Sequence, residues 1–110
     1  MASISVGHAM PRHVDVVLKP AEAHEDCVSL ERGQPLQYHF TLDPPGRFEL
    51  YHRDGKQVAY ALRSESVREQ KGDYVAPAAR RYCLKWRGVG SGDTRLGYEF
   101  MVVEPGLTKP

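Results

Sequence analysis

Apolar and polar residues alternate along several short stretches of this chain, the pattern typical of strands with one buried face. The clearest runs are residues 36–42 and 82–86, where leucine and aromatic side chains occupy every second position. Further runs lie at residues 13–19, 27–30, 47–52, 57–62 and 94–103, and residues 72–77 fit a short strand or a corner. Seven to eight short strands with almost no helix predict an all-β fold, an antiparallel, jelly-roll-like β-sandwich; an open barrel is the alternative topology.

Glycine and proline mark the connections between these runs. Asp54-Gly55 is a strong signal for a two-residue hairpin. Gly33 predicts a turn with a positive φ angle. Residues 43–46, Asp-Pro-Pro-Gly, are expected to end the strand before them. Residues 21–26 favour a connection, and residues 64–71 fit either a short helix or an exposed strand.

The chain of 110 residues is long enough for one hydrophobic core and too short for two. We expect a flexible arm over residues 1–12, a single β-sandwich domain over residues 13–104 and a tail over residues 105–110. The side chains expected to form the core are Tyr38, Phe40, Phe48, Leu50, Tyr60, Leu84, Trp86, Tyr98 and Phe100.

The composition argues against several classes of function. The charged share is 26% and the net charge is +1, so no strong field favours nucleic acid or an anionic membrane. No run of about 18 apolar residues is present, so the chain is not expected to span a membrane. The first residues lack the basic and apolar regions of a signal peptide. No motif predicts a cofactor, and the expected partner is a protein or a peptide.

The two cysteines, Cys27 and Cys83, are far apart in the sequence and neither belongs to a CxxC pair. A zinc site is therefore poorly supported. Two options remain open from the residues themselves, a single disulfide and two free buried thiols. A bridge would stabilise the fold by roughly 4 kcal/mol through loop closure.

Candidate chemistry outside the strands is sparse. His8, Met10 and His13 together could hold a soft metal such as copper, since imidazole and thioether groups suit it, although their spacing fits no standard site. A thiol enzyme would need Cys27 or Cys83 as a free nucleophile near a histidine. Acidic pairs in polar connections offer no apolar pocket that would raise a pKa for acid–base catalysis. We therefore expect no catalysis.

The features between Cys27 and Val103 follow a recognisable order. A cysteine at Cys27 precedes a glycine turn at Gly33 and the alternating strand over 36–42, and the Asp-Gly hairpin comes next. The closing block holds Cys83, Leu84-Lys85-Trp86, Ser91 and Tyr98. This order resembles the GOLD (Golgi dynamics) domain, which occurs in cargo receptors of the early secretory pathway and in some lipid-transfer proteins.

The resemblance implies an eight-stranded β-sandwich with a Cys27–Cys83 bridge that binds a protein without catalysis. A bridge implies an oxidising compartment, either periplasmic or extracellular or in the secretory lumen. The candidate binding loops are those at the ends of the sandwich, with Pro44, Pro45, Gly46, Gly88, Gly90 and Ser91. The alternative function is a periplasmic metal-binding protein that uses His8, Met10 and His13, and a thiol enzyme ranks last.

Overall fold

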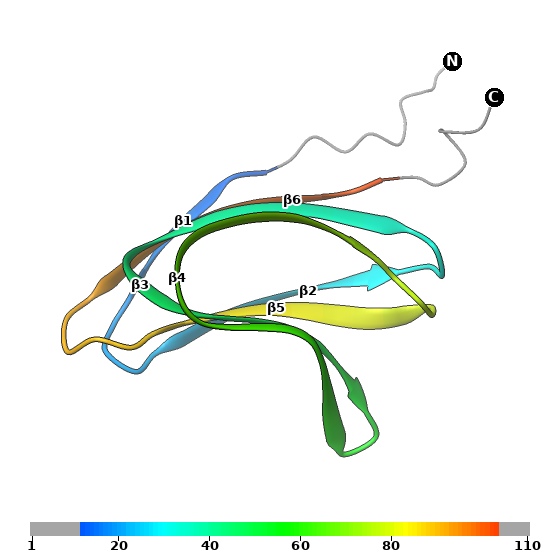
Figure 1. Ribbon diagram of the computed structural model, residues 1–110, viewed down its shortest axis with the longest axis horizontal. Coiled ribbons are helices and arrows are strands. Elements are labelled where there is room, and N and C mark those ends of the chain that lie inside the picture. The colour runs from blue at the N-terminus through cyan, green and yellow to red at the C-terminus, as the bar shows by residue number, and fades with distance from the viewer. Residues whose placement is uncertain (1–11, 104–110) are drawn as a thin grey trace.

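The computed structural model describes residues 12–103, which form six antiparallel strands in a single sheet. The strands are β1 (Val14–Leu18), β2 (Ala23–Leu30), β3 (Pro35–Asp54), β4 (Gln57–Val75), β5 (Arg80–Gly88) and β6 (Thr94–Val102) (Figure 1). This part of the chain contains no helix, and hence none that could cross a membrane. The all-β antiparallel class is confirmed, but the strands number six rather than seven to eight.

The count differs because β3, of 20 residues, covers two of the expected strands, and β4, of 19 residues, also extends well beyond the strand expected over residues 57–62. The expectation that residues 43–46 end a strand is wrong, since β3 continues through them. The pairing of β3 with β4 shifts register between Thr41 and Gly46 and again between Gly46 and Phe48. Irregular pairing of this kind bends a strand sharply without ending it. Gly46 is required at the bend, because a Cβ atom there would lie 2.6 Å from the carbonyl oxygen of Arg87.

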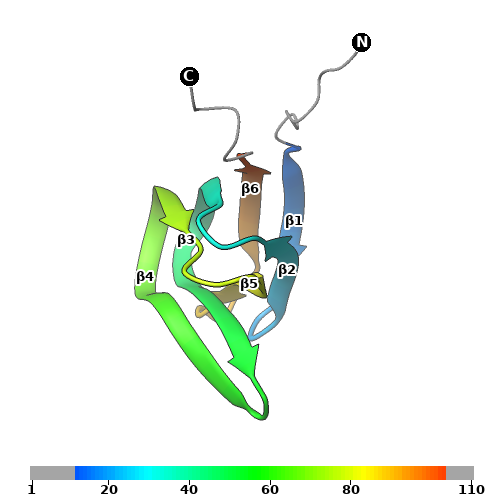
Figure 2. The same ribbon diagram turned by 90° about the vertical axis from the view of Figure 1, so that its right-hand side faces the viewer.

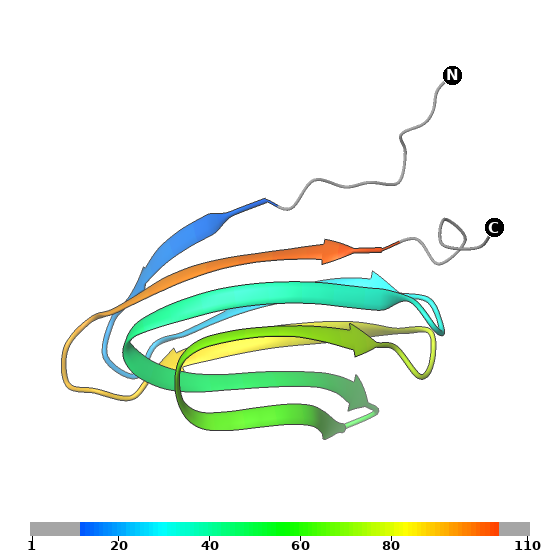
Figure 3. The same cartoon turned by 45° about the horizontal axis from the view of Figure 1, so that its top comes forward.

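The bend divides the sheet into two halves that face each other (Figures 1 and 3). In the β6 half, the first part of β3 pairs with β6, and β6 pairs with β1. In the β5 half, the last part of β3 pairs with β5, and β5 pairs with β2. Strand β4 follows β3 through both halves and pairs with no other strand of the described part. Two separate sheets, as in a sandwich, are not confirmed, because all six strands belong to one sheet.

The core lies between the two halves and consists of leucine and aromatic side chains. Trp86 stacks on Tyr98 with ring centroids 4.4 Å apart, and it contacts Phe48 at 5.7 Å. Seven of the nine expected core residues are buried, namely Tyr38, Phe40, Phe48, Leu50, Leu84, Trp86 and Tyr98. Phe100 is partly buried against this cluster. The assignment of Tyr60 to the core is wrong: its side chain is 46% exposed on the β3–β4 hairpin.

Several local expectations can be compared directly with the backbone. The Asp54-Gly55 hairpin is confirmed, with Asp54 paired to Gln57, and Gly33 has a φ angle of 81°. Residues 21–26 are not simply a connection, because β2 already begins at Ala23. Residues 64–71 are extended and belong to β4, so the strand alternative is the correct one.

Cys27 and Cys83 form a disulfide that joins β2 to β5. The two residues are direct cross-strand partners, and their Cα atoms are 4.0 Å apart. Both cysteines of the chain are therefore oxidised, and the option of two free thiols is excluded. Since β2 is an edge strand whose only strand pairing is with β5, the bridge fixes it to the rest of the sheet.

Candidate functional site

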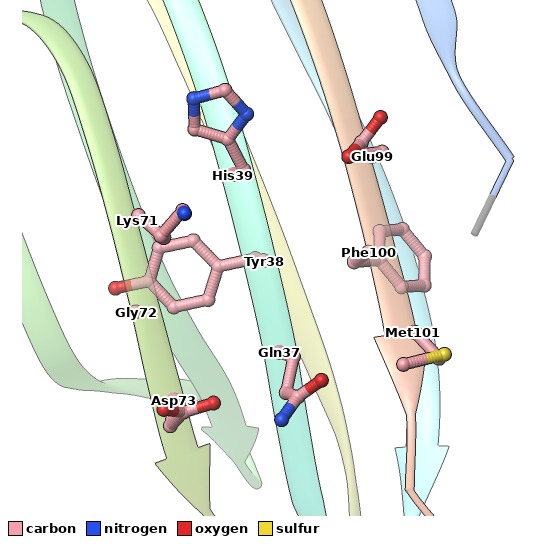
Figure 4. Close-up of a pocket in the computed structure, with 9 residues that line it drawn as sticks. All are labelled: Gln37, Tyr38, His39, Lys71, Gly72, Asp73, Glu99, Phe100 and Met101. Carbon is pink, nitrogen blue, oxygen red and sulfur yellow. The ribbon is translucent and has the colours of Figure 1, made fainter.

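A shallow groove of about 310 Å³ opens on the outer face of the β6 half, across β4, β3 and β6 (Figure 4). Its sides are two cross-strand rows of three residues, Lys71–His39–Glu99 and Asp73–Gln37–Met101. Between these rows, Gly72, Tyr38 and Phe100 form the floor. The side chain of Tyr38 points to the core and its ring lies against Gly72, where a Cβ atom would meet the hydroxyl at 2.6 Å.

The groove exists because of the two-residue period of the strands. Residues 37 and 39 project outward while Tyr38 projects inward, and β6 repeats this arrangement around Phe100. The missing side chain at Gly72 leaves room for the Tyr38 ring on the core side. The register then aligns residues that are more than 25 positions apart in the sequence.

Histidine–carboxylate pairs lie along the same face. Nε2 of His39 is 2.7 Å from a carboxylate oxygen of Glu69. Nε2 of His13 is 2.9 Å from Asp15, and its Nδ1 is 3.4 Å from Glu99. Hydrogen bonds to Asp15 and then to Glu99 raise the pKa of His13 above its usual value of 6.5. Both pairs are exposed, so they affect the charge of this face more than the stability of the fold.

A second hollow continues the groove along β6 toward β1. It has a volume of about 490 Å³ and lies around Gly97, with Asp15, Thr41 and Arg95 among its walls. The whole outer face of the β6 half carries five carboxylates, those of Asp15, Asp43, Glu69, Asp73 and Glu99. Its cations are Lys71, Arg95 and Arg68, the last of which pairs with Asp43 at 3.6 Å. The face is therefore negative by two charges when its histidines are neutral.

This arrangement is suited to contact with a macromolecule rather than to chemistry. The groove is open to solvent, so its carboxylates are not placed in an apolar environment that would raise a pKa for catalysis. Both cysteine sulfurs of the chain are in the disulfide, which leaves no thiol nucleophile. The rim offers hydrogen-bonding groups beside the apolar side chain of Met101. This combination suits a long side chain such as lysine or arginine, whose methylene groups are apolar and whose end is charged.

A polar cluster connects the edge strand β2 to the β6 half across the core. The hydroxyl of Tyr98 donates to Asp26 at 2.7 Å, and Nε2 of His24 lies 3.0 Å from the same hydroxyl. Burial, and next the hydrogen bond to Asp26, raise the pKa of Tyr98 far above its usual value. His24 also stacks on Trp86 at 6.2 Å. The cluster satisfies polar groups at the margin of the core, and its evident role is to hold β2 in place.

The candidate binding loops meet at the bend, where Gly46 and Gly88 are cross-strand partners, and they lie apart from the groove. Pro44, Pro45 and Gly46 lie within β3 at the bend, and Gly88 is the last residue of β5. Gly90 and Ser91 are in the connection between β5 and β6. None of these six residues lines the groove. Polar residues at alternate positions of the predicted strands were the available signal for the groove, but the strand register was needed to bring them together.

The metal candidates are only partly visible, because His8 and Met10 lie outside the described residues. His13 is engaged with Asp15 and Glu99 on the outer face. Within residues 12–103, Glu25, Cys27 and Cys83 form the one group of side chains with metal-ligand spacing. Two of these three are the disulfide, whose sulfurs are not thiolates, so this group does not provide a metal site.

Comparison with known proteins relates this chain to others through its fold. No family model matches the sequence, and no curated protein matches it. The PliG protein of Aeromonas hydrophila, a periplasmic inhibitor of g-type lysozyme, superposes with a TM-score of 0.64 at 9% identity, covering 91% of this chain and 92% of that one. PliG of Salmonella Typhimurium, also a periplasmic inhibitor of g-type lysozyme, superposes with a TM-score of 0.59 at 16% identity, covering 92% of this chain and 94% of that one. The similarity extends over nearly the whole domain, and it shows a shared fold.

Proposed function

We propose that this protein is a non-catalytic, protein-binding β module that contacts its partner through the groove on the β6 half. The observation that carries the proposal is the open groove itself, with hydrogen-bonding side chains on both sides and an uninterrupted strand backbone as its floor. A small ligand would be left largely in solvent there, because small-molecule sites bury most of the ligand surface. A protein surface that covers the groove fits its shape better.

The shared fold supports this role. Both PliG proteins are inhibitors, and an inhibitor acts by binding another protein. The periplasmic location in their descriptions agrees with the disulfide of this chain, since such bonds persist in oxidising compartments. An oxidising compartment, periplasmic, extracellular or in the secretory lumen, is therefore part of the proposal. The GOLD resemblance stays a prediction, and it implies the same non-catalytic binding of a protein.

The charge of the face indicates the chemistry of the partner. With five carboxylates and three cations, the outer face of the β6 half attracts a protein segment rich in lysine or arginine. Asp73 and Glu99 stand on the two sides of the groove and can each accept from a cationic side chain. Binding of this kind weakens as salt screens the exposed charges.

The experiment is a titration of the isotopically labelled domain with g-type lysozyme, followed by amide resonances and by calorimetry. We expect saturable binding whose perturbed amides include residues 37–39, 71–73 and 99–101. The double variant Asp73→Asn/Glu99→Gln should lose about 30-fold or more in affinity, since it removes two charge-assisted contacts of at least about 1 kcal/mol each. The matched control is Glu25→Gln on the opposite face, which should bind normally.

A negative lysozyme titration is followed by cross-linking capture from periplasmic extract with the wild-type domain and the double variant. Recovery of one protein by the wild type but not by the variant supports the proposal. Recovery of the same protein by both forms, or of none by either, refutes it.

A further inference from the structure

We propose that the opposite face carries a second docking surface, centred on Tyr60, that accepts an acidic segment of a partner protein. This surface lies on the outer side of the β5 half and includes Tyr51, Arg53, Val58, Tyr60 and Arg63, here called the tyrosine–arginine surface. It is separate from the groove on the β6 half, so the proposal goes beyond the function proposed above.

The surface is built on a hairpin that leaves the body of the sheet. Beyond His52, which pairs with Tyr82, the end of β3 and the start of β4 diverge from β5 (Figures 1 and 2). Val58, Tyr60 and Leu62 are 36%, 46% and 37% exposed. They are three of the six large apolar side chains exposed within residues 12–103. Val58 and Tyr60 share the outer face as partners of Arg53 and Tyr51, whereas Leu62 is the partner of the core-facing Leu50. Exposed apolar side chains that lie together on one face are typical of an interaction site.

A β-bulge directs Val58 and Tyr60 to the outer face. Leu50 pairs with Leu62, whereas the next residue, Tyr51, pairs with Tyr60, so Ala61 is an extra residue in β4. Leu50 points to the core, and Tyr51 therefore points outward. The bulge brings Tyr60 to the same outward side, with the two rings 6.0 Å apart. Without it, the alternation set by Leu62 would turn Tyr60 toward the core side.

Two arginines complete the cluster. The guanidinium of Arg53 lies 5.7 Å from the centre of the Tyr51 ring, and that of Arg63 lies 4.4 Å from the centre of the Tyr60 ring. Arg63 also approaches Glu49 and Glu65, at 3.8 and 3.9 Å, beyond good hydrogen-bond distance. Arg53 has no carboxylate within ion-pair distance in the part of the chain that the structure describes. Tyrosine and arginine are the residues enriched at the energetic centres of protein interfaces.

The charge of the face indicates what binds there. Its cations are Arg47, Arg53, Arg63, Arg81, Lys85 and Arg87. Its carboxylates are Glu25, Glu49 and Glu65. The surplus of three positive charges contrasts with the negative face of the β6 half, although the whole chain has a net charge of only +1. An acidic segment complements this surplus and meets a free guanidinium at Arg53.

A protein segment fits this surface better than a nucleic acid does. The three carboxylates lie among the cations and would repel a continuous line of phosphates. Single-stranded nucleic acids bind by stacking bases on open aromatic faces. Here one face of Tyr60 is already covered by Arg63, and Tyr51 is only 3% exposed.

The test is a selection of displayed random peptides, about 16 residues long, on the intact domain, followed by affinity measurement of the enriched sequences. We expect these sequences to be rich in aspartate and glutamate and to perturb the amides of residues 51–63. Tyr60→Ser and, separately, Arg53→Ser should each weaken binding by about 30-fold, as for interface hot spots. Two variants are used because Tyr60 packs on Tyr51, whereas Arg53 is an exposed cation.

The control is Asp73→Asn/Glu99→Gln, which removes the charges of the groove and should leave these peptides bound with unchanged affinity. Loss of binding in that control alone assigns the peptides to the groove and overturns this proposal. It is likewise overturned if the enriched peptides are basic, or if both hairpin variants bind them as well as the wild type does. Tighter binding of an oligothymidine of about 12 nucleotides at residues 51–63, or self-association through this hairpin, also overturns it.

Discussion

Removing the disulfide should cost this domain a large part of its stability. Cys27 and Cys83 are separated by 56 positions, so the bridge closes a long loop in the unfolded chain. Chain-entropy arithmetic for a loop of that length gives about 4 kcal/mol at room temperature. Small domains have a total stability of about 5–15 kcal/mol, so the loss would approach the whole of it for a marginal fold. The effect is expected mainly through the unfolded state. Strand pairing already places Cys27 beside Cys83 in the folded domain, and Cys27 is only partly buried, so the substitution should remove little folded-state packing.

The measurement is denaturant unfolding of the wild type and of Cys27→Ser/Cys83→Ser, each with and without reducing agent. The midpoint of the double variant should fall, and its denaturant slope should rise because its unfolded chain exposes more surface. Reducing agent should move the wild type toward the variant and leave the variant unchanged, which is the internal control. In the variant, amide exchange should increase most in β2, whose strand pairing is with β5 alone. A loss of stability below about 1 kcal/mol, with an unchanged slope, would refute the loop-closure reasoning.

Three further outcomes can be measured. Leu84→Ala should destabilise the domain by about 2–5 kcal/mol in equilibrium unfolding, because the side chain is completely buried; a cost below about 1 kcal/mol would contradict its place in the core. Tyr98→Phe should cost about 1 kcal/mol by removing the hydrogen bond to Asp26. In the wild type, absorbance titration should show the Tyr98 phenol still protonated where exposed tyrosines ionise; ionisation with the others would contradict this. His13 should titrate above pH 6.5 by NMR, and Asp15→Asn should lower its pKa. Because the folded-state pKa of His13 is raised, its contribution to stability is complete below pH 6.5 and disappears as the pH rises through that pKa. An unchanged His13 pKa in Asp15→Asn would exclude Asp15 as the cause of the shift.

The alternation of side chains was sufficient to predict the all-β class and most of the core. Residues 36–42 and 82–86 have the predicted faces, since burial of every second side chain is a local property of a strand. Residues 43–46 misled the prediction because strand pairing holds both ends of this turn-prone stretch, with Asp43 paired to β6 and Gly46 paired to β4 and β5. The start of β2 was missed for a similar reason, since His24 and Glu25 gain partners only when β5 places Trp86 and Lys85 beside them.

The candidate sites depended on long-range register, which no local pattern contains. The groove brings together β3, β4 and β6, and its rows depend on which residue of one strand faces which residue of the next. The outward position of Tyr60 depends on a single extra residue, Ala61, opposite the Leu50–Tyr51 step. A one-residue shift moves a side chain to the other face of a sheet, so strict alternation assigned Tyr60 to the core.

The unbroken course of β3 and β4 through the bend has a consequence for cooperativity. Neither half of the molecule has a complete set of strands of its own, since each takes two of its four strands from the same two segments, β3 and β4. Unfolding of one half would release the β3–β4 pair that the other half also contains, so the domain should lose its structure in a single all-or-none step. No stable fragment should then be obtainable by cutting the chain between the two halves.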